Sequence, residues 1–134
     1  VHYDEMVAIA GPGHPLTTRA PLHARDLVDH PFIGRERGSG TRDVIEAALR
    51  ALSVELEPAM SLGSTEAIKR LVMDGAGFAL VSRLAVEREL AEGRLVALQV
   101  EDLSIRRALH LVRLGGKRPT PASESFVRML RSAL

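Results

Sequence analysis

The stretch PFIGRERGSGTRDVIEAALRAL, residues 31–52, joins a short apolar run to a helical pattern through a glycine-rich turn. From Thr41 onward the apolar residues recur every three or four positions, at Val44, Ile45, Ala48, Leu49 and Leu52. That spacing places them on one face of a helix. The change of period therefore predicts a strand near residues 31–34, followed by an amphipathic helix.

The same alternation of strands and helices continues along the chain. Further strands are expected at 6–10, 57–62, 78–81, 95–100 and 105–114, and further helices at 21–28, 64–74, 83–92 and after Thr120. Short strands joined through helices are typical of an α/β fold. We therefore expect a mostly parallel sheet with helices on both faces.

Composition excludes several classes of protein. The 134 residues are 46% apolar and 26% charged, with a net charge of +1, which excludes a disordered chain and fits one domain or less. No apolar run approaches the roughly 20 residues of a membrane span, so no membrane partner is expected. The absence of cysteine excludes thiol catalysis and disulfides. The near-zero net charge argues against nucleic-acid binding by this chain alone.

The turn Gly38-Ser39-Gly40-Thr41-Arg42 has the chemistry of an anion site. A helix start leaves several backbone N–H groups unpaired, and its dipole favours negative charge. The hydroxyls of Ser39 and Thr41 and the guanidinium of Arg42 or Arg35 would add donors. The alternative is that Ser39 or Thr41 only caps the helix. The turn is not a phosphate-binding P-loop, because no Gly-Lys-Ser/Thr follows it.

A second helix start of this kind is Gly63-Ser64-Thr65-Glu66. If both helices follow parallel strands, both starts lie at the carboxyl edge of the sheet, where α/β proteins bind ligands. Ser64 and Thr65 would then face the first turn across one small-molecule pocket. The alternative is an ordinary helix cap.

No catalytic, metal or cofactor site is expected. The five histidines are scattered, without the spacing of metal ligands. No Gly-x-Ser-x-Gly nucleophile motif is present. The sequence therefore favours a binding domain over an enzyme.

The order of these features resembles the C-terminal part of the effector-binding domain of LysR-type transcriptional regulators. The resemblance covers essentially the whole chain and is strongest in three stretches: GPGHPL (11–16), HPFIGRERGSGTR (30–42) and LGSTEAIKRLVMDGAGFALVSRLAVERELAEGRLVAL (62–98). It implies an effector domain of two α/β lobes, similar to periplasmic binding proteins, with the ligand between them. Residues 1–104 would form the second lobe. Residues 105–134 would form a crossover strand and a helix returning to the first lobe, most of which is missing.

The resemblance also implies a function. The effector-binding residues would be Ser39, Gly40, Thr41, Ser64 and Thr65, to which the turn chemistry adds Arg42. Binding of a small anionic or carboxylate effector would shift the population of lobe arrangements in a cytoplasmic dimer and thereby change its DNA binding. DNA contact would come only through a missing N-terminal domain, and the helix at 64–74 is expected to mediate self-association.

Two other functions are compatible with this sequence pattern. The first is one lobe of an extracytoplasmic solute-binding protein, which would be expected to have a leader and both lobes. The second is a small enzyme using the same crevice, for which a base beside Ser39 or Thr41 would be the mark.

Overall fold

The structure, a computed structural model, describes residues 2–134. The chain divides into two compact units. The larger unit is Asp4–Arg107, and the smaller consists of the residues up to Tyr3 together with Ala108–Leu134. Both candidate helix starts belong to the larger unit.

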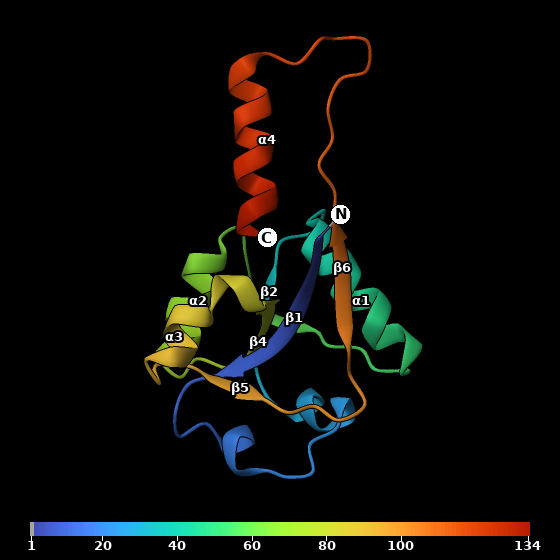
Figure 1. Cartoon of the computed structure of the whole chain (residues 1–134). Coiled ribbons are helices and arrows are strands. Elements are labelled where there is room, and N and C mark those ends of the chain that lie inside the picture. The colour runs from blue at the N-terminus through green and yellow to red at the C-terminus, as the bar shows by residue number, and fades with distance from the viewer. Residues whose placement is uncertain (1) are drawn as a thin grey trace. The chain divides into compact units, whose positions relative to one another are not determined.

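Residues 2–134 form six strands and four α-helices, and strands and helices alternate from β2 to β5 (Figure 1). The strands are β1 (His2–Ala10), β2 (Phe32–Arg35), β3 (Pro58–Leu62), β4 (Ala79–Ser82), β5 (Val96–Leu98) and β6 (Ile105–Leu109). The α-helices are α1 (Gly40–Ala51), α2 (Thr65–Met73), α3 (Glu87–Ala91) and α4 (Pro121–Ala133). Short 3-10 turns occupy Pro15–Thr18, Ala24–Asp29 and Arg83–Ala85.

The predicted mostly parallel sheet is wrong for the largest sheet. Strand β1 lies between β4 and β5 and pairs antiparallel with both, whereas β2 and β3 form a separate parallel pair. A parallel bridge between Phe32 and Phe78 joins β2 to the start of the β4 segment. Helical connections from residue 31 onward explain why β2, β3 and β4 run in one direction. Strand β1 precedes that series, so no helical crossover fixes its direction.

Both faces of the larger sheet are covered by helices. Met6, Ala8 and Ala10 of β1 lie in one apolar cluster, and Val7 and Ile9 lie in another, as the alternation of a strand requires. Helix α1 adds Ile45 and Leu49 to the first cluster, while α2 adds Ile68 and Val72 to the second. Figure 1 shows α1 on one side of the strands and α2 with α3 on the other.

Strand β6 is shorter than the sequence predicts. Strand β6 ends at Leu109, short of the predicted end at residue 114. The residues between it and α4 are exposed, and among the described residues they have no strand partner. Thr120 caps α4 as predicted, because its Oγ1 accepts a hydrogen bond from the amide of Ser123 at 3.2 Å. Across residues 2–134 we find no helix with the length and apolar content of a membrane span.

Candidate functional site

The start of α1 is shaped by its own cap. Gly38 has a φ of +87°, a left-handed conformation that favours glycine, and it turns the chain after β2. Ser39 is buried, and its Oγ accepts a hydrogen bond from the amide of Arg42 at 3.4 Å. The capping interpretation therefore holds for Ser39. Gly40 begins the helix, and a Cβ at that position would meet no other atom.

The start of α2 is built in the same way. Ser64 Oγ accepts a hydrogen bond from the amide of Ala67 at 3.3 Å, so Ser64 is a cap as well. In both helices the cap is followed by a threonine at the first or second helical position, Thr41 in α1 and Thr65 in α2. Because each serine supplies the side-chain cap of its helix, the hydroxyls of the threonines are left for other contacts.

Thr41 and Thr65 line the same cleft. Its volume is about 380 Å³, and all the residues that form it belong to the larger unit. The lining residues are Arg35, Thr41, Thr65, Glu66, Leu80, Val81, Ser82, Leu84, Ala85 and Arg107. The two helix starts therefore converge. Of the predicted site residues, the two threonines reach the cleft, while Ser39, Gly40 and Ser64 are not among its lining residues.

Each threonine in the cleft accepts a hydrogen bond from an arginine. Arg35 Nη1 lies 3.4 Å from Thr65 Oγ1, and Arg107 Nη1 lies 2.9 Å from Thr41 Oγ1. A hydroxyl that accepts from a guanidinium still has its own hydrogen to donate. The two arginine–threonine pairs thus offer donors to a ligand in the cleft.

Both arginines are also paired with carboxylates. Arg35 Nε lies 2.9 Å from Glu36 Oε2, and this hydrogen bond raises the pKa of Arg35 and lowers the pKa of Glu36. Arg107 Nη2 lies 2.9 Å from Asp4 Oδ2, and the Asp4 side chain is fully buried. Both guanidinium groups are therefore fixed in place before any ligand arrives.

Sequence reasoning missed Asp4 and assigned Arg107 no role in the site. The sequence does contain a signal for Asp4. Residues two apart in a strand share a face, so Asp4 lies on the same face of β1 as Met6 and Ala8, which face the core. A carboxylate at a buried position requires hydrogen-bonding partners. Besides Arg107, Asp4 accepts a hydrogen bond from Ser82 Oγ at 2.8 Å.

Arg42 does not join the other predicted residues. Its Nε donates to Glu46 Oε1 at 2.6 Å, and its Nη1 donates to the backbone oxygen of Arg35 at 3.1 Å. It lines a different hollow, of about 510 Å³, between α1 and the segment preceding β3. Arg42 thus connects α1 to the end of β2 and does not line the cleft.

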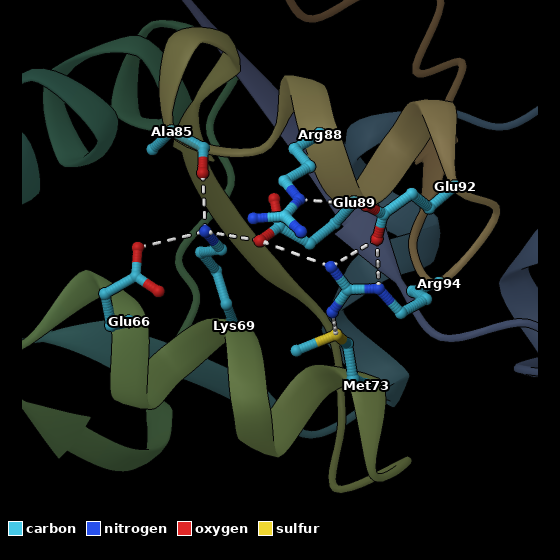
Figure 2. A network of polar contacts seen from close by, with 8 residues as sticks. All are labelled: Glu66, Lys69, Met73, Ala85, Arg88, Glu89, Glu92 and Arg94. Atoms are coloured by element: carbon cyan, nitrogen blue, oxygen red, sulfur yellow. Dashed lines mark hydrogen bonds and ion pairs between the residues drawn. The ribbon is translucent and has the colours of Figure 1, made fainter.

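A buried lysine holds one edge of the cleft. Figure 2 shows Lys69 Nζ between Glu66 Oε1, Glu89 Oε1 and the backbone oxygen of Ala85, at 2.9, 2.8 and 2.7 Å. Burial acts to lower the pKa of Lys69, but the hydrogen bonds to Glu89 and Glu66 outweigh it and raise that pKa. Lys69 therefore remains a cation, and it holds the carboxylate of Glu66 at the edge of the cleft.

Comparison with known sequences gives one consistent family. The family model described as the LysR substrate binding domain matches residues 2–134. The chain is 40% identical over 121 residues to an HTH-type transcriptional regulator of Mycobacterium tuberculosis, covering 87% of this chain and 39% of that protein. It is 38% identical to the HTH-type transcriptional regulator CbbR of Rhodospirillum rubrum, covering 96% of this chain and 42% of CbbR. The chain thus spans about two fifths of the length of these relatives.

Solved structures agree with the sequence matches. The regulatory domain of CcmR from Synechocystis PCC6803, solved in complex with 2-PG, superposes with a TM-score of 0.79 at 27% identity. That match covers 98% of this chain and 63% of the CcmR chain. The effector-binding domain of QuiR, solved with shikimate, gives a TM-score of 0.74 at 19% identity, covering 97% and 61% of the two chains. The relatives from Mycobacterium tuberculosis and Rhodospirillum rubrum are transcriptional regulators, which agrees with the expectation of a binding domain and not an enzyme.

Proposed function

The chain belongs to the family of LysR substrate-binding domains, and on that premise we propose that it senses a small anion for a transcription regulator. As an effector-binding domain it would bind its ligand without covalent chemistry. DNA binding would come from a separate domain of the regulator, as the relatives' name of HTH-type regulator suggests. Relatives that regulate transcription favour this function over that of a solute-binding protein, which shares the fold.

The two arginine–threonine pairs in one cleft are the observation on which the proposal depends. A carboxylate, phosphate or sulfate offers several acceptor oxygens, and charge-assisted hydrogen bonds to arginine are stronger than neutral ones. The starts of α1 and α2 add their dipoles and the amides that no intrahelical carbonyl reaches. The regulatory domain of CcmR, solved in complex with 2-PG, supports a small ligand of this kind.

We assign different roles to the predicted effector residues. Thr41 and Thr65 would contact the effector through their hydroxyls. Ser39 and Ser64 would act through their caps, which fix the two helix starts, and Gly40 would leave the first amide of α1 accessible. Arg42 would hold the end of β2, and with it Arg35, through its hydrogen bond to the Arg35 backbone.

The proposal extends to how binding is signalled. Residues 1–104 would act as the second lobe of a two-lobed domain, and residues 105–134 would return the chain to the first lobe. The effector would favour one arrangement of the lobes and so shift the population of DNA-binding states in a dimer. Such a regulator would work in the cytoplasm.

Self-association through residues 64–74 belongs to the same proposal. The exposed side chains of this segment include Glu66, Arg70 and Asp74, so charges of both signs are available to a second copy. Analytical ultracentrifugation of the chain and of the Arg70→Glu variant tests it. We expect the variant to be more monomeric at equal concentration. An unchanged distribution would rule out this segment as the contact.

Isothermal titration calorimetry of the 134-residue chain with inorganic phosphate, sulfate and 2-PG tests the effector proposal. We expect saturable binding of at least one probe, and a loss of about tenfold in affinity for Thr41→Val and for Thr65→Val, since each removes one hydrogen bond to a charged group. Thr18→Val is the matched control, because Thr18 lies in a 3-10 turn and does not line the cleft. No binding of any probe, or unchanged affinity in both cleft variants, would overturn the proposal.

A further inference from the structure

The side chain of Arg107 combines a fixed position with unused hydrogen-bonding capacity. Its Nε and Nη2 lie 3.0 and 2.9 Å from Asp4 Oδ2, and its Nη1 lies 2.9 Å from Thr41 Oγ1. A guanidinium has five N–H bonds, so these three contacts leave two. The side chain lines the cleft and is 26% exposed. Its remaining donors are therefore within reach of a ligand there.

We propose that Arg107 binds the anionic effector directly and that Asp4 is the residue that positions its guanidinium. The inference rests on the proposed function, because it assigns a further contact in the same cleft. It also identifies the ligand class more closely. A planar guanidinium with its donors in a fixed fork matches a carboxylate or phosphate, which have several acceptor oxygens, better than it matches a halide.

The burial of Asp4 supports a positioning role. A carboxylate removed from water is costly, and a buried ion pair is often no more stabilising than apolar residues of similar volume. Asp4 is nonetheless held by three groups, which are the Nε and Nη2 of Arg107 and the hydroxyl of Ser82. These contacts connect β1, β4 and β6. They hold the guanidinium toward α1. Without these contacts, the arginine side chain would be free to adopt many rotamers.

The Asp4–Arg107 ion pair lies at both ends of the larger unit along the chain. Asp4 and Arg107 are the first and last residues of the larger unit, so the chain enters and leaves that unit at this ion pair. An effector bound to Arg107 would therefore act on β6, one of the two strands by which the chain passes between the units. Thr41 and Thr65, by contrast, stand at the starts of helices within the larger unit.

A titration of the chain with phosphate and with 2-PG, followed by calorimetry and by the NMR signals of arginine Nε–H groups, tests the inference. We expect Arg107→Lys, which retains a cation beside Asp4, to weaken binding at least fivefold. We expect Asp4→Asn to weaken it several-fold and to shift the Arg107 Nε–H signal even without ligand. In the unsubstituted chain that signal should move on saturation. Arg83→Met is the matched control, because Arg83, in the 3-10 turn that follows β4, pairs with Glu5 of β1 and does not line the cleft.

The outcomes separate this inference from the proposed function. If the unsubstituted chain binds no probe, the proposed function fails and this inference fails with it. If it binds, but Arg107→Lys binds equally well and the Arg107 signal does not move, only the role of Arg107 is refuted. If Asp4→Asn folds, binds normally and leaves the Arg107 signal unchanged, its positioning role is refuted. Since Arg107→Lys retains the buried pair, the test holds even where Asp4→Asn does not fold.

Discussion

Replacing Lys69 by methionine tests how the cleft edge and the packing of α2 against α3 are held. The Lys69 side chain is 6% exposed, and its ammonium contacts Glu89, Glu66 and the Ala85 carbonyl (Figure 2). Methionine retains an unbranched apolar chain of similar length but removes the charge and all three hydrogen bonds. The Glu89 side chain, 11% exposed, would then be left without its main partner.

The structure sets the size of the effect. Removing one partner of a buried ion pair costs about 3–5 kcal/mol in general. Two features reduce this cost in the Lys69 network. The Glu66 side chain is 79% exposed, so water can hydrate its carboxylate once Lys69 is removed. In addition, Arg94 Nη2 already lies 3.9 Å from Glu89 Oε1. We expect Lys69→Met to lower the free energy of unfolding by about 2–3 kcal/mol at neutral pH.

The effect should depend on pH in a defined direction. Hydrogen bonding to Lys69 lowers the pKa of Glu89, so the stability that this carboxylate contributes is present above its unfolded pKa and is lost as the pH falls through the folded value. The pKa of Lys69 is raised, so its contribution is present below its unfolded pKa and is lost as the pH rises through the folded value. The stability deficit of Lys69→Met should therefore be greatest between about pH 5 and pH 10. It should shrink below about pH 4.

Urea unfolding followed by circular dichroism measures this deficit, since the chain has no tryptophan to serve as a fluorescence probe. The control is Arg88→Met, which removes the exposed ion pair with Glu92 from the same network. We expect the control to leave the unfolding midpoint unchanged. A second substitution, Glu89→Gln, should restore part of the stability lost in Lys69→Met. A Lys69→Met protein as stable as the parent at pH 7, or one equally weakened at pH 3.5, would refute this reasoning.

Three further outcomes follow from the structure. Ser39→Ala should lower the free energy of unfolding by about 1 kcal/mol in urea unfolding, because Ser39 caps α1. Thr41→Ala should leave the free energy of unfolding nearly unchanged and weaken anion binding measured by calorimetry. Equal destabilisation by the two substitutions would contradict the assignment of the cap to Ser39. Ile9→Ala should cost about 2–5 kcal/mol in the same unfolding assay, since Ile9 is fully buried on the sheet face that α2 covers, and a loss below about 1 kcal/mol would show that this packing is wrong. The chain alone should give no sequence-specific DNA complex in a gel-shift assay at about 0.15 M salt, and a tight specific complex would overturn its assignment to the sensing part.

The sequence was sufficient for the features that depend on local patterns. The spacing of Val44, Ile45 and Leu49 correctly predicted an amphipathic helix, and Ser39 and Ser64 were recognised as candidate caps. Sheet direction was not predictable in the same way, because β1 pairs with β4 and β5 across 70 or more residues and no local motif records that pairing. The antiparallel orientation therefore appeared only in the structure.

The site could be predicted only at its helix starts. The sequence located Thr41 and Thr65, because a helix start after a glycine turn is a local signal. It did not locate Arg107. Adjacent residues of a strand point to opposite faces, so the sequence alone does not tell which of the two arginines of β6 faces the site. The contact of Arg107 with Asp4 joins residues 103 positions apart. Only the pairing of β6 with β1 brings them together.

The most direct test of anion binding at the two helix starts is a crystal structure of the chain grown with selenate, whose selenium is visible by anomalous scattering. We expect a selenium peak in the cleft, with selenate oxygens within hydrogen-bonding distance of Thr41 Oγ1 and Thr65 Oγ1. A cleft without selenate in crystals that bind the anion elsewhere, with Arg107 still donating to Thr41, would contradict it.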